Sequence, residues 1–429
     1  MRIALYNIGC KVNYAETIHL QKQFNANGYE IVKFGNECDI VIINTCTVTL
    51  KADSDSRKVI RRAIRDNPEA FVVVTGCYAQ LHSIDISSIE GVDAIIGNEE
   101  KFQLLEIINK FDKKEHSNIF ISDSSSWQAH SAISVDEDSR TRAVLKIQDG
   151  CDYKCTYCSV AFARGPSRSV PLDEIRMRIK EAMASNFFEL ILTGINLGDW
   201  KIDNKRFINV LKMIEDIETG EMRFRISSIE PNLLTDEIIE LVANSQKICP
   251  HFHIPLQSGS DNILKLMKRR YLVRIFIDRI EKIKSYMPDC CIGVDVICGF
   301  PGETIECFQE TYDLILSLPI SYLHVFTYSE RKETEANNLQ GTVSIVERKR
   351  RTKLLRELSD RKKTEFYFSQ IGKIKIAIPE KYNFNNKQWH GRTENYLRVQ
   401  AESFGNNDCK PVKIIIEEAK KNYVTGKLC

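Results

Sequence analysis

Short apolar runs alternate with helix-length segments along most of the chain, and this alternation constrains the fold more than any other feature. Continuous apolar runs of this kind are typical of strands that are buried on both faces of a parallel sheet. The first third contains three of them, at Ile3–Ile8, Asp39–Thr45 and Phe71–Gly76, with helical segments at Tyr14–Gly28 and Lys51–Asp66. Residues 1–111 are therefore predicted to form an α/β domain with a doubly wound parallel sheet.

The alternation resumes over residues 141–345 and continues for more units there. Six runs have the length and composition of buried strands: Ala143–Gln148, Phe188–Thr193, Arg223–Ser228, His251–Leu256, Cys291–Ile297 and Ser321–Thr327. Helical segments such as Leu172–Asn186 and Glu303–Ser317 lie between them. Six strand–helix units are too many for the first sheet, so we predict a central partial (β/α)6 barrel.

Composition changes on both sides of this central region. Residues 112–140 are polar and rich in serine, which favours a linker. Residues 346–371 are expected to form a basic connecting helix, because the stretch 347–375 holds 11 Lys and Arg residues against 4 acidic ones. Residues 372–429 alternate apolar and polar positions between turns rich in Asn and Gly, which predicts a small antiparallel β-domain.

Net charge and hydropathy exclude several classes of protein. A formal charge of +2 over 429 residues argues against a uniformly basic nucleic-acid binder, although a local basic patch is compatible with it. No apolar run approaches the roughly 20 residues that a membrane helix needs. The N-terminal segment lacks the features of a signal peptide, so we expect a cytoplasmic protein with no membrane partner. In that compartment the 14 cysteines should be reduced, either as core residues or as ligands of a soft metal.

Three cysteines form a C-x3-C-x2-C loop directly after a predicted strand. These residues, Cys151, Cys155 and Cys158, have the spacing to wrap three thiolates around one corner of a 4Fe–4S cluster. The fourth iron would then stay open for a small molecule. A zinc site is the alternative, but zinc would need a fourth ligand, and no Cys or His follows within twenty residues.

Three further cysteines follow three successive strands of the first domain. Cys10, Cys46 and Cys77 each lie just beyond the C-terminal end of a predicted strand. Because these ends meet at one edge of a parallel sheet, the three thiols are expected to come together and hold a second cluster. The alternative is that buried cysteines occur at three strand ends by chance. Cys38 lies at the opposite end of its strand and is predicted to be structural.

The loop motif resembles that of the radical S-adenosylmethionine (SAM) superfamily. The resemblance implies that the open iron binds SAM and that one electron cleaves it to a 5′-deoxyadenosyl radical, with Cys151, Cys155 and Cys158 as the catalytic cluster ligands. Segments at later strand ends are also similar to that superfamily: Leu192–Asn196, Ser227–Pro231, Pro255–Ser260 and Gly299–Thr304. They imply a set of SAM-binding residues, to which an arginine of the loop is added: Thr193, Gly194, Asn196, Ser228, Glu230, Gln257 and Arg168.

Two cysteine trios together narrow the resemblance to the methylthiotransferases. Gly9–Asn13, Asn44–Thr49 and Thr75–Gln80 resemble that family's N-terminal domain, and Cys155–Ser169 resembles its radical SAM loop. Gly372–Leu428 resembles its TRAM domain, a small RNA-binding β-barrel. The Lys-Val-Asn after Cys10 is similar to the branch that acts on tRNA threonylcarbamoyladenosine. The resemblance implies addition of a methylthio group to C2 of N6-threonylcarbamoyladenosine at position 37, next to the anticodon.

The same resemblance implies the cofactors and partners. These are two 4Fe–4S clusters, SAM, the tRNA anticodon stem-loop, a small electron donor such as flavodoxin or ferredoxin, and a sulfur donor. Alternatives are methylthiolation of isopentenyladenosine or of a ribosomal protein aspartate, and a non-catalytic iron–sulfur protein that binds RNA. We expect phosphate contacts from a set of basic residues: Arg348, Arg350, Arg351, Lys353, Arg361, Lys362 and Lys363. Tyr396, Arg398 and Lys413 are expected to contact RNA from strands of the C-terminal domain. His251 and His253 are interpreted as core or pocket residues rather than metal ligands.

Overall fold

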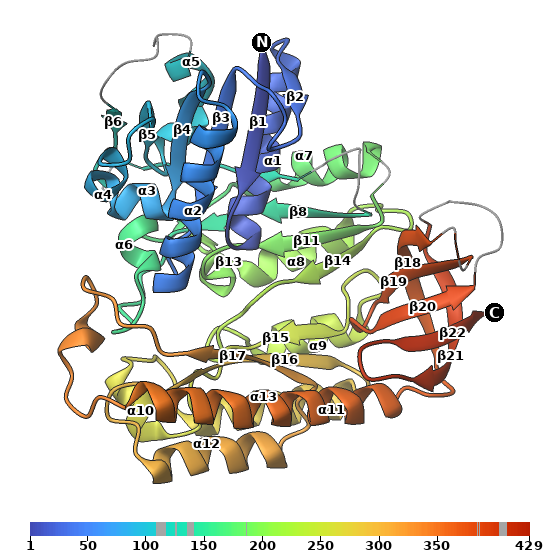
Figure 1. Ribbon diagram of the computed structural model, residues 1–429. Helices are drawn as coiled ribbons and strands as arrows, with labels where there is room; N and C mark the ends of the chain where they lie inside the picture. Colours follow the sequence, from blue (N-terminus) through green and yellow to red (C-terminus); the bar gives the residue numbers. More distant parts are fainter. Residues whose placement is uncertain are drawn as a thin grey trace.

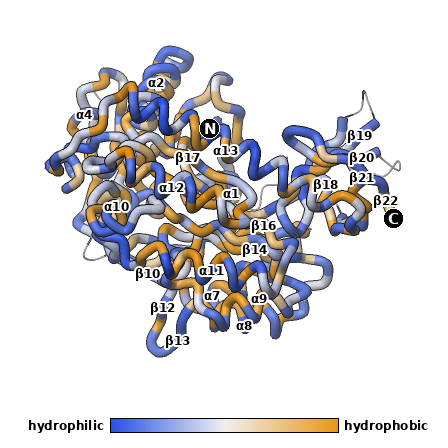
Figure 2. The backbone as a smooth tube through the Cα atoms, turned by 90° about the horizontal axis from the view of Figure 1, so that it is seen from below, coloured by the Kyte–Doolittle hydropathy of each residue, from blue (hydrophilic) through white to orange (hydrophobic). Residues whose placement is uncertain are grey.

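The computed structural model describes residues 1–108, 117–124, 127–134, 141–185, 187–383, 385, 387–402 and 410–429. Figure 1 shows the N-terminal sheet in blue lying over the green strands of the central region, with the red C-terminal barrel beside them. The hydrophobic segments concentrate on the strands, whereas helix α2 (Leu50–Asp66) and the β12–β13 hairpin (Lys201–Ile202, Lys205–Arg206) are largely hydrophilic (Figure 2). Among the described residues, no helix is both long and apolar enough to cross a membrane.

Six parallel strands form the N-terminal sheet in the order β2-β1-β3-β4-β5-β6. The strands are β1 (Arg2–Asn7), β2 (Glu30–Val32), β3 (Ile40–Thr45), β4 (Phe71–Gly76), β5 (Ala94–Ile96) and β6 (Asn118–Phe120). Helices α1 (Lys11–Ala26) and α5 (Leu104–Ile108) pack on one face, with η1 (Glu100–Gln103) leading into α5. On the other face lie α2, α3 (Cys77–Leu81) and α4 (Ser83–Ser87). The predicted doubly wound parallel sheet is confirmed.

Six parallel strands also build the central region, divided between two hydrogen-bonded sheets. They are β8 (Arg142–Lys146), β11 (Glu189–Thr193), β14 (Arg223–Ile226), β15 (His251–His253), β16 (Cys291–Cys298) and β17 (Tyr322–Thr327). Isolated bridges, including Ser228 to His253, connect β14 to β15 and close the curve of a partial barrel. The short strand β7 (Ala132–Ile133) adds an antiparallel edge to β8. The predicted partial (β/α)6 barrel is confirmed.

Helices cover the outside of this partial barrel, and one long helix leads out of it. They are α7 (Leu172–Ala184), α8 (Phe207–Asp216), α9 (Asp236–Asn244), α10 (Asp261–Leu266), α11 (Val273–Tyr286) and α12 (Ile305–Ser317), with the short α6 (Val160–Arg164) and η3 (Leu197–Asp199) in loops. The loops also carry β9 (Gln148–Asp149), β10 (Arg168–Ser169) and η4 (Glu335–Asn338). Helix α13 (Ile345–Phe368) runs along β17 and ends at the C-terminal barrel.

Five strands close the C-terminal barrel in the order β18-β19-β20-β22-β21. They are β18 (Ile374–Asn383), β19 (Gln388–Thr393), β20 (Arg398–Glu402), β21 (Val412–Ala419) and β22 (Val424–Leu428). All neighbouring pairs are antiparallel except β20 and β22, which are parallel. The predicted small β-barrel is therefore confirmed, with one parallel pair that closes it.

Candidate active site at two cysteine trios

The loop trio, Cys151, Cys155 and Cys158, gathers in the turn between β9 and α6. Its backbone is held by Cys151 N–H donating to the Gly165 carbonyl at 3.0 Å and Cys158 N–H donating to the Cys155 carbonyl at 3.1 Å. All three residues line one cavity of about 510 Å³, and Cys158 also lines a neighbouring cavity of about 210 Å³ inside the barrel. The contiguous motif therefore places three thiols on one open space, as the spacing predicts.

The electrostatics of the loop trio favour binding of a positively charged group. Burial, with smaller contributions from the charges of Cys158 and Cys155, raises the pKa of Cys151 to about 12. Burial likewise raises the pKa of Cys158 to about 11, with Cys155 adding to the effect. Three neighbouring thiolates need a compensating cation, so the donor set fits an iron–sulfur cluster. Arg269 Nη1 donates to Cys155 Sγ at 3.2 Å and supplies part of that compensation.

Several of the residues predicted to bind SAM surround the loop trio. Asn196 Nδ2 lies 3.9 Å from Cys151 Sγ, and its backbone N–H donates to Gln148 Oε1 at 2.8 Å. Gly194 packs so closely on Gln148 that a Cβ atom there would lie 2.7 Å from Oε1 of that residue. Among the described residues, the buried oxygens Asn196 Oδ1 and Gln257 Oε1 have no hydrogen-bond partner. Gln257 lines the cavity that Cys158 also lines, and Asn196 lies beside Cys151, so these unpaired acceptors fit the polar groups of SAM.

The other predicted SAM residues have partners within the protein. Thr193 is buried at the end of β11. Ser228 Oγ lies 2.9 Å from His253 Nδ1, and Glu230 forms an ion pair with Arg269. Burial raises the pKa of Glu230, and Arg269 opposes that rise. Arg168 donates to the carbonyls of Gln128 and Arg164 at 3.1 and 2.9 Å, and it does not line either cavity.

The strand-end trio, Cys10, Cys46 and Cys77, comes from three elements of the N-terminal sheet. Cys10 is the N-cap of α1, Cys46 follows β3, and Cys77 begins α3. Burial raises the pKa of Cys46 to about 12, and the charges of Cys77 and Cys10 add to it, so the three thiols form one electrostatic group. Cys38 is buried at the opposite end of β3, outside this group. The donor set again fits a cluster held by three thiolates.

Gly9 provides the space for this strand-end trio. Its φ of +121° is a left-handed conformation that glycine adopts at low cost. A Cβ atom at this position would lie 2.8 Å from Cys46 Cβ and 3.1 Å from Cys46 Sγ. The tight turn after β1 therefore allows Cys10 and Cys46 to lie close together without a side chain between them.

The two trios are direct neighbours in space. Ser159, next to Cys158, donates from Oγ to the carbonyl of Thr47, next to Cys46, at 3.1 Å. Asn98 Nδ2 donates to the Ala163 carbonyl at 2.7 Å across the same boundary. Arg164 Nε, from α6, donates to Cys77 Sγ at 3.3 Å. The loop that carries one trio thus forms part of the wall around the other.

From its place in the radical SAM loop, Arg164 is interpreted as a contact to the SAM carboxylate or the RNA, but the structure buries it among acidic side chains. Its guanidinium is buried and bonds to Glu16 at 3.0 Å, to Asp149 at 3.0 Å and to Asn13 Oδ1 at 2.6 Å. Burial alone would raise the pKa of Glu16, but the charges of Arg164, Lys101 and Lys146 hold it well below its usual range. Glu16, Lys101 and Arg164 come from elements far apart in sequence, so no motif spacing indicates the network.

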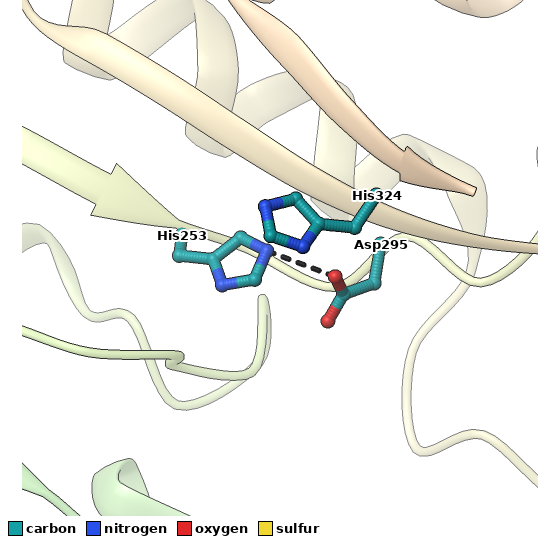
Figure 3. A group of neighbouring side chains, drawn as sticks. All are labelled: His253, Asp295 and His324. Atoms are coloured by element: carbon teal, nitrogen blue, oxygen red, sulfur yellow. Dashed lines mark ion pairs between the residues drawn. The ribbon is translucent and has the colours of Figure 1, made fainter. Parts of the chain in front are cut away.

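A group of two histidines and an aspartate lines the barrel on β15, β16 and β17. Figure 3 shows His253, Asp295 and His324 pointing toward one another. His253 Nε2 lies 2.9 Å from Asp295 Oδ1, while its Nδ1 faces Ser228 Oγ. The approach of His253 Nε2 to Asp295 Oδ1 is a close contact without a hydrogen bond, and ligand atoms of all three residues lie within 4.8 Å of one another, close enough to hold a metal ion. The pocket role of His253 stays a prediction. His251 is buried and packs its ring 4.4 Å from that of Tyr396.

Some of the basic side chains of helix α13 lie inside the protein. Arg348, Arg351 and Lys362 are buried. Arg351 Nη1 donates to Glu303 Oε2 at 2.7 Å, and Lys362 Nζ donates to the Leu318 carbonyl at 2.8 Å. The prediction that these three residues contact RNA phosphates is wrong, because their charges satisfy buried acceptors. Arg350, Lys353 and Arg361 remain exposed.

Tyr396 also differs from its predicted place. It lies in the turn between β19 and β20, at a φ of +69°, rather than on a strand. Its ring packs against His251, and the Arg225 guanidinium lies 5.0 Å from the ring centroid. Tyr396 therefore joins the C-terminal barrel to the central region. Arg398 and Lys413 lie on β20 and β21 as predicted.

Comparison with known proteins matches two families to this chain. Residues 145–315 match the radical SAM superfamily, and residues 2–97 match the uncharacterized protein family UPF0004. A cobalamin-containing radical SAM methyltransferase, TsrM from Kitasatospora setae, superposes with a TM-score of 0.56 at 15% identity. That superposition covers 78% of this chain and 77% of TsrM, and it indicates a shared fold.

Curated relatives extend over nearly the whole chain. The threonylcarbamoyladenosine tRNA methylthiotransferase MtaB of Bacillus subtilis is 38% identical, over 99% of this chain and 96% of that protein. The protein of the same name from Aquifex aeolicus is 36% identical, over 94% and 97%. A tRNA-2-methylthio-N(6)-dimethylallyladenosine synthase from Endomicrobium trichonymphae is 31% identical over the full length of both.

The partial barrel and its three-thiol loop define a radical SAM enzyme, a class that uses a 4Fe–4S cluster and SAM. Within that class, the relatives that match nearly the full length of the chain identify its family more narrowly than the two domain matches do. The chain belongs to the methylthiotransferase family whose curated members are named MtaB.

Proposed function

We propose that this chain adds a methylthio group to C2 of N6-threonylcarbamoyladenosine at position 37 of tRNA. The names of its most similar curated relatives support this substrate. The observation that carries the proposal is the hydrogen bond from Ser159 to Thr47, which joins the loop trio to the strand-end trio. A reaction that must combine a radical with a sulfur atom on one carbon requires two cofactors this close together.

In this proposal each trio holds a 4Fe–4S cluster. When bound, the loop cluster and SAM supply a radical, and the strand-end cluster supplies the sulfur. The C2–H bond of adenine is not acidic, so general bases with ordinary pKa values cannot activate it. The work of the protein is then to position the base and to exclude water. Asn196 and Gln257 would orient SAM, and Arg164 would fix the wall between the two trios.

A row of rings gives the base a path to the two trios. Tyr396 packs on His251 with the ring centroids 4.4 Å apart, and Tyr322 stacks on His251 and His253 at 6.4 and 6.3 Å. The row leads from a cleft of about 600 Å³ at Cys10 toward the barrel cavity at Asp295. Aromatic side chains stack well on unpaired bases, so this row suits a nucleotide that leaves its stem-loop.

The remaining partners follow from the reaction. One-electron cleavage of SAM needs a reductant, for which we propose a small electron carrier such as flavodoxin or ferredoxin. Repeated turnover also needs a sulfur donor for the strand-end cluster. With tRNA as the substrate, we propose the cytoplasm as the location, in keeping with the membrane finding above.

Three alanine variants test the assignment of the trios. After anaerobic reconstitution, the wild type should hold about eight irons per chain, since each 4Fe–4S cluster contributes four. Cys155→Ala should form no 5′-deoxyadenosine with dithionite, whereas Cys46→Ala should still form it but yield no methylthiolated nucleoside. Cys38→Ala, the matched control from the same sheet, should retain both clusters and full product. Nucleoside mass spectrometry and iron analysis provide the measurements.

Two results would contradict the proposal. Full 5′-deoxyadenosine formation by Cys155→Ala would refute the assignment of the loop trio. A wild type that modifies dimethylallyladenosine tRNA in preference to threonylcarbamoyladenosine tRNA would favour the second candidate. That candidate rests on the 31% identical relatives named as dimethylallyladenosine synthases.

A further inference from the structure

A cleft of about 600 Å³ opens where the three parts of the chain meet. Its walls come from the start of α1 and from β8, β11 and the C-terminal barrel. Cys10 lines it, so the cleft reaches the strand-end trio directly. Tyr396 lines it from the barrel side and begins the row of rings described above.

Two arginines at this cleft are already paired. Arg142 forms ion pairs with Glu380 at 2.8 Å and with Glu189 at 3.7 Å. Arg225, which lies behind Tyr396, forms an ion pair with Glu189 at 2.8 Å. These pairs fix the walls of the cleft and leave Arg142 and Arg225 no need of an external anion.

Lys11, in contrast, has no ion-pair or hydrogen-bond partner among the residues that the structure describes. The residue is exposed and lines the cleft together with Cys10 and Tyr396. Lys11 is also the first residue of α1, where the helix dipole disfavours a cation. An anion in the cleft would offset this unfavourable position of the ammonium.

The proposed substrate carries such an anion. A threonylcarbamoyl group ends in a carboxylate only a few bonds from the purine ring, whereas a dimethylallyl group is neutral. Lys11 adjoins Cys10, and consecutive Cα atoms lie about 3.8 Å apart. A base whose C2 faces the strand-end trio therefore keeps its N6 substituent within reach of this ammonium.

We propose that Lys11 binds the carboxylate of the threonylcarbamoyl group and so selects this nucleoside. The inference rests on the proposed function, because it concerns the same substrate. A carboxylate can pair with this ammonium and a dimethylallyl group cannot, so Lys11 favours the threonylcarbamoyl group.

Binding of paired anticodon stem-loops tests the role of Lys11. One stem-loop carries threonylcarbamoyladenosine at position 37 and the other carries unmodified adenosine. For the reconstituted enzyme, Lys11→Gln should weaken binding of the threonylcarbamoyl RNA about 10- to 100-fold, the range for one charged hydrogen-bonded contact. It should leave the affinity for the unmodified RNA unchanged. Lys11→Arg should retain most of the discrimination, because it retains the charge.

Lys381→Gln is the matched control, since Lys381 is an exposed cation that lines the same cleft from the C-terminal barrel. This variant should change the affinities of both RNAs by the same factor. Equal weakening of both RNAs by Lys11→Gln would indicate a phosphate contact and overturn the proposal, as would no weakening at all. A wild type that does not distinguish the two RNAs would instead overturn the proposed substrate. Iron analysis confirms that each variant is folded and loaded.

Discussion

The two cysteine trios hold the same number of thiols but are built in opposite ways. The loop trio comes from eight consecutive residues, Cys151 to Cys158, whose backbone turn brings the thiols together locally. The strand-end trio spans residues 10 to 77 and exists only when β1, β3 and β4 lie side by side. A local motif can be recognised from its spacing, whereas a dispersed one depends on the topology of the sheet.

This difference has consequences for stability. The loop trio needs only its own turn, but the strand-end trio depends on packing at three strand ends and on Arg164 from another region. Changes to the N-terminal sheet or to its boundary should therefore affect the strand-end cluster more than the loop cluster. The following predictions test that asymmetry.

The largest effect is expected from Arg164→Met. This change leaves the buried carboxylates of Glu16 and Asp149 without their shared guanidinium. Loss of one partner from a buried ion pair costs about 3–5 kcal/mol of unfolding free energy. Urea titration should detect this loss, and iron analysis should find the strand-end cluster depleted first. Arg65→Met is the control, because the Arg65–Asp66 pair is exposed and should contribute less than about 1 kcal/mol.

A smaller effect is expected from Gly9→Ala. The new methyl group would press against Cys46, and such overpacking costs about 1–3 kcal/mol. Iron content should fall from two clusters toward one, while 5′-deoxyadenosine formation continues at the loop trio. Gly28→Ala is a matched control, because Gly28 also has a positive φ of +82° but has no atom within 4 Å of the added Cβ. Equal loss of iron in both variants would show that backbone strain, rather than contact with Cys46, is responsible.

The smallest effect is an acid dependence at the boundary of the N-terminal sheet. Burial on α1, with the charges of Arg178 and Lys146, lowers the pKa of His19 to about 4 from an ordinary 6.5. The unfolded chain therefore binds the proton first as pH falls. Neutral His19 therefore contributes to the free energy of unfolding. This contribution is complete above pH 6.5 and is lost progressively between pH 6.5 and 4, by about 1 kcal/mol at pH 5.5.

His19→Gln should remove this part of the acid dependence. Unfolding free energies of both proteins at pH 7.5 and 5.5 provide the measurement, and the difference between the two pH values should be smaller for the variant. Direct titration of the imidazole by NMR gives a second check. A pKa near 6.5 in the folded protein would contradict the prediction.

The strands and the loop trio were predictable because their signals are local. Residues 303–317 are predicted to be helical and contain α12, and the six central strands match the six apolar runs. The strand-end trio was also predictable, since the rule that parallel strand ends meet at one edge replaces the missing spacing. The parallel pairing of β20 with β22 was not, because it depends on how the barrel closes.

The burial of side chains whose partners are distant in sequence was not predicted. Arg351 reads as a surface cation, yet its partner Glu303 lies 48 residues earlier and draws it into the protein. Arg164 is similar, with Glu16 at a separation of 148 residues. Charge patterns along a helix describe its own surface, but they contain no information about acceptors that the fold brings to it.

The contact between Ser159 and Thr47 also limits how such an enzyme can be divided. If the gene were split after the N-terminal sheet, each product would expose half of a buried ionic cluster, with Glu16 on one polypeptide and Arg164 on the other. Neither fragment would be expected to persist alone. Under the proposed function, sulfur delivery and radical generation are thus inherited as one unit, and substitutions near either trio must be compatible with the other.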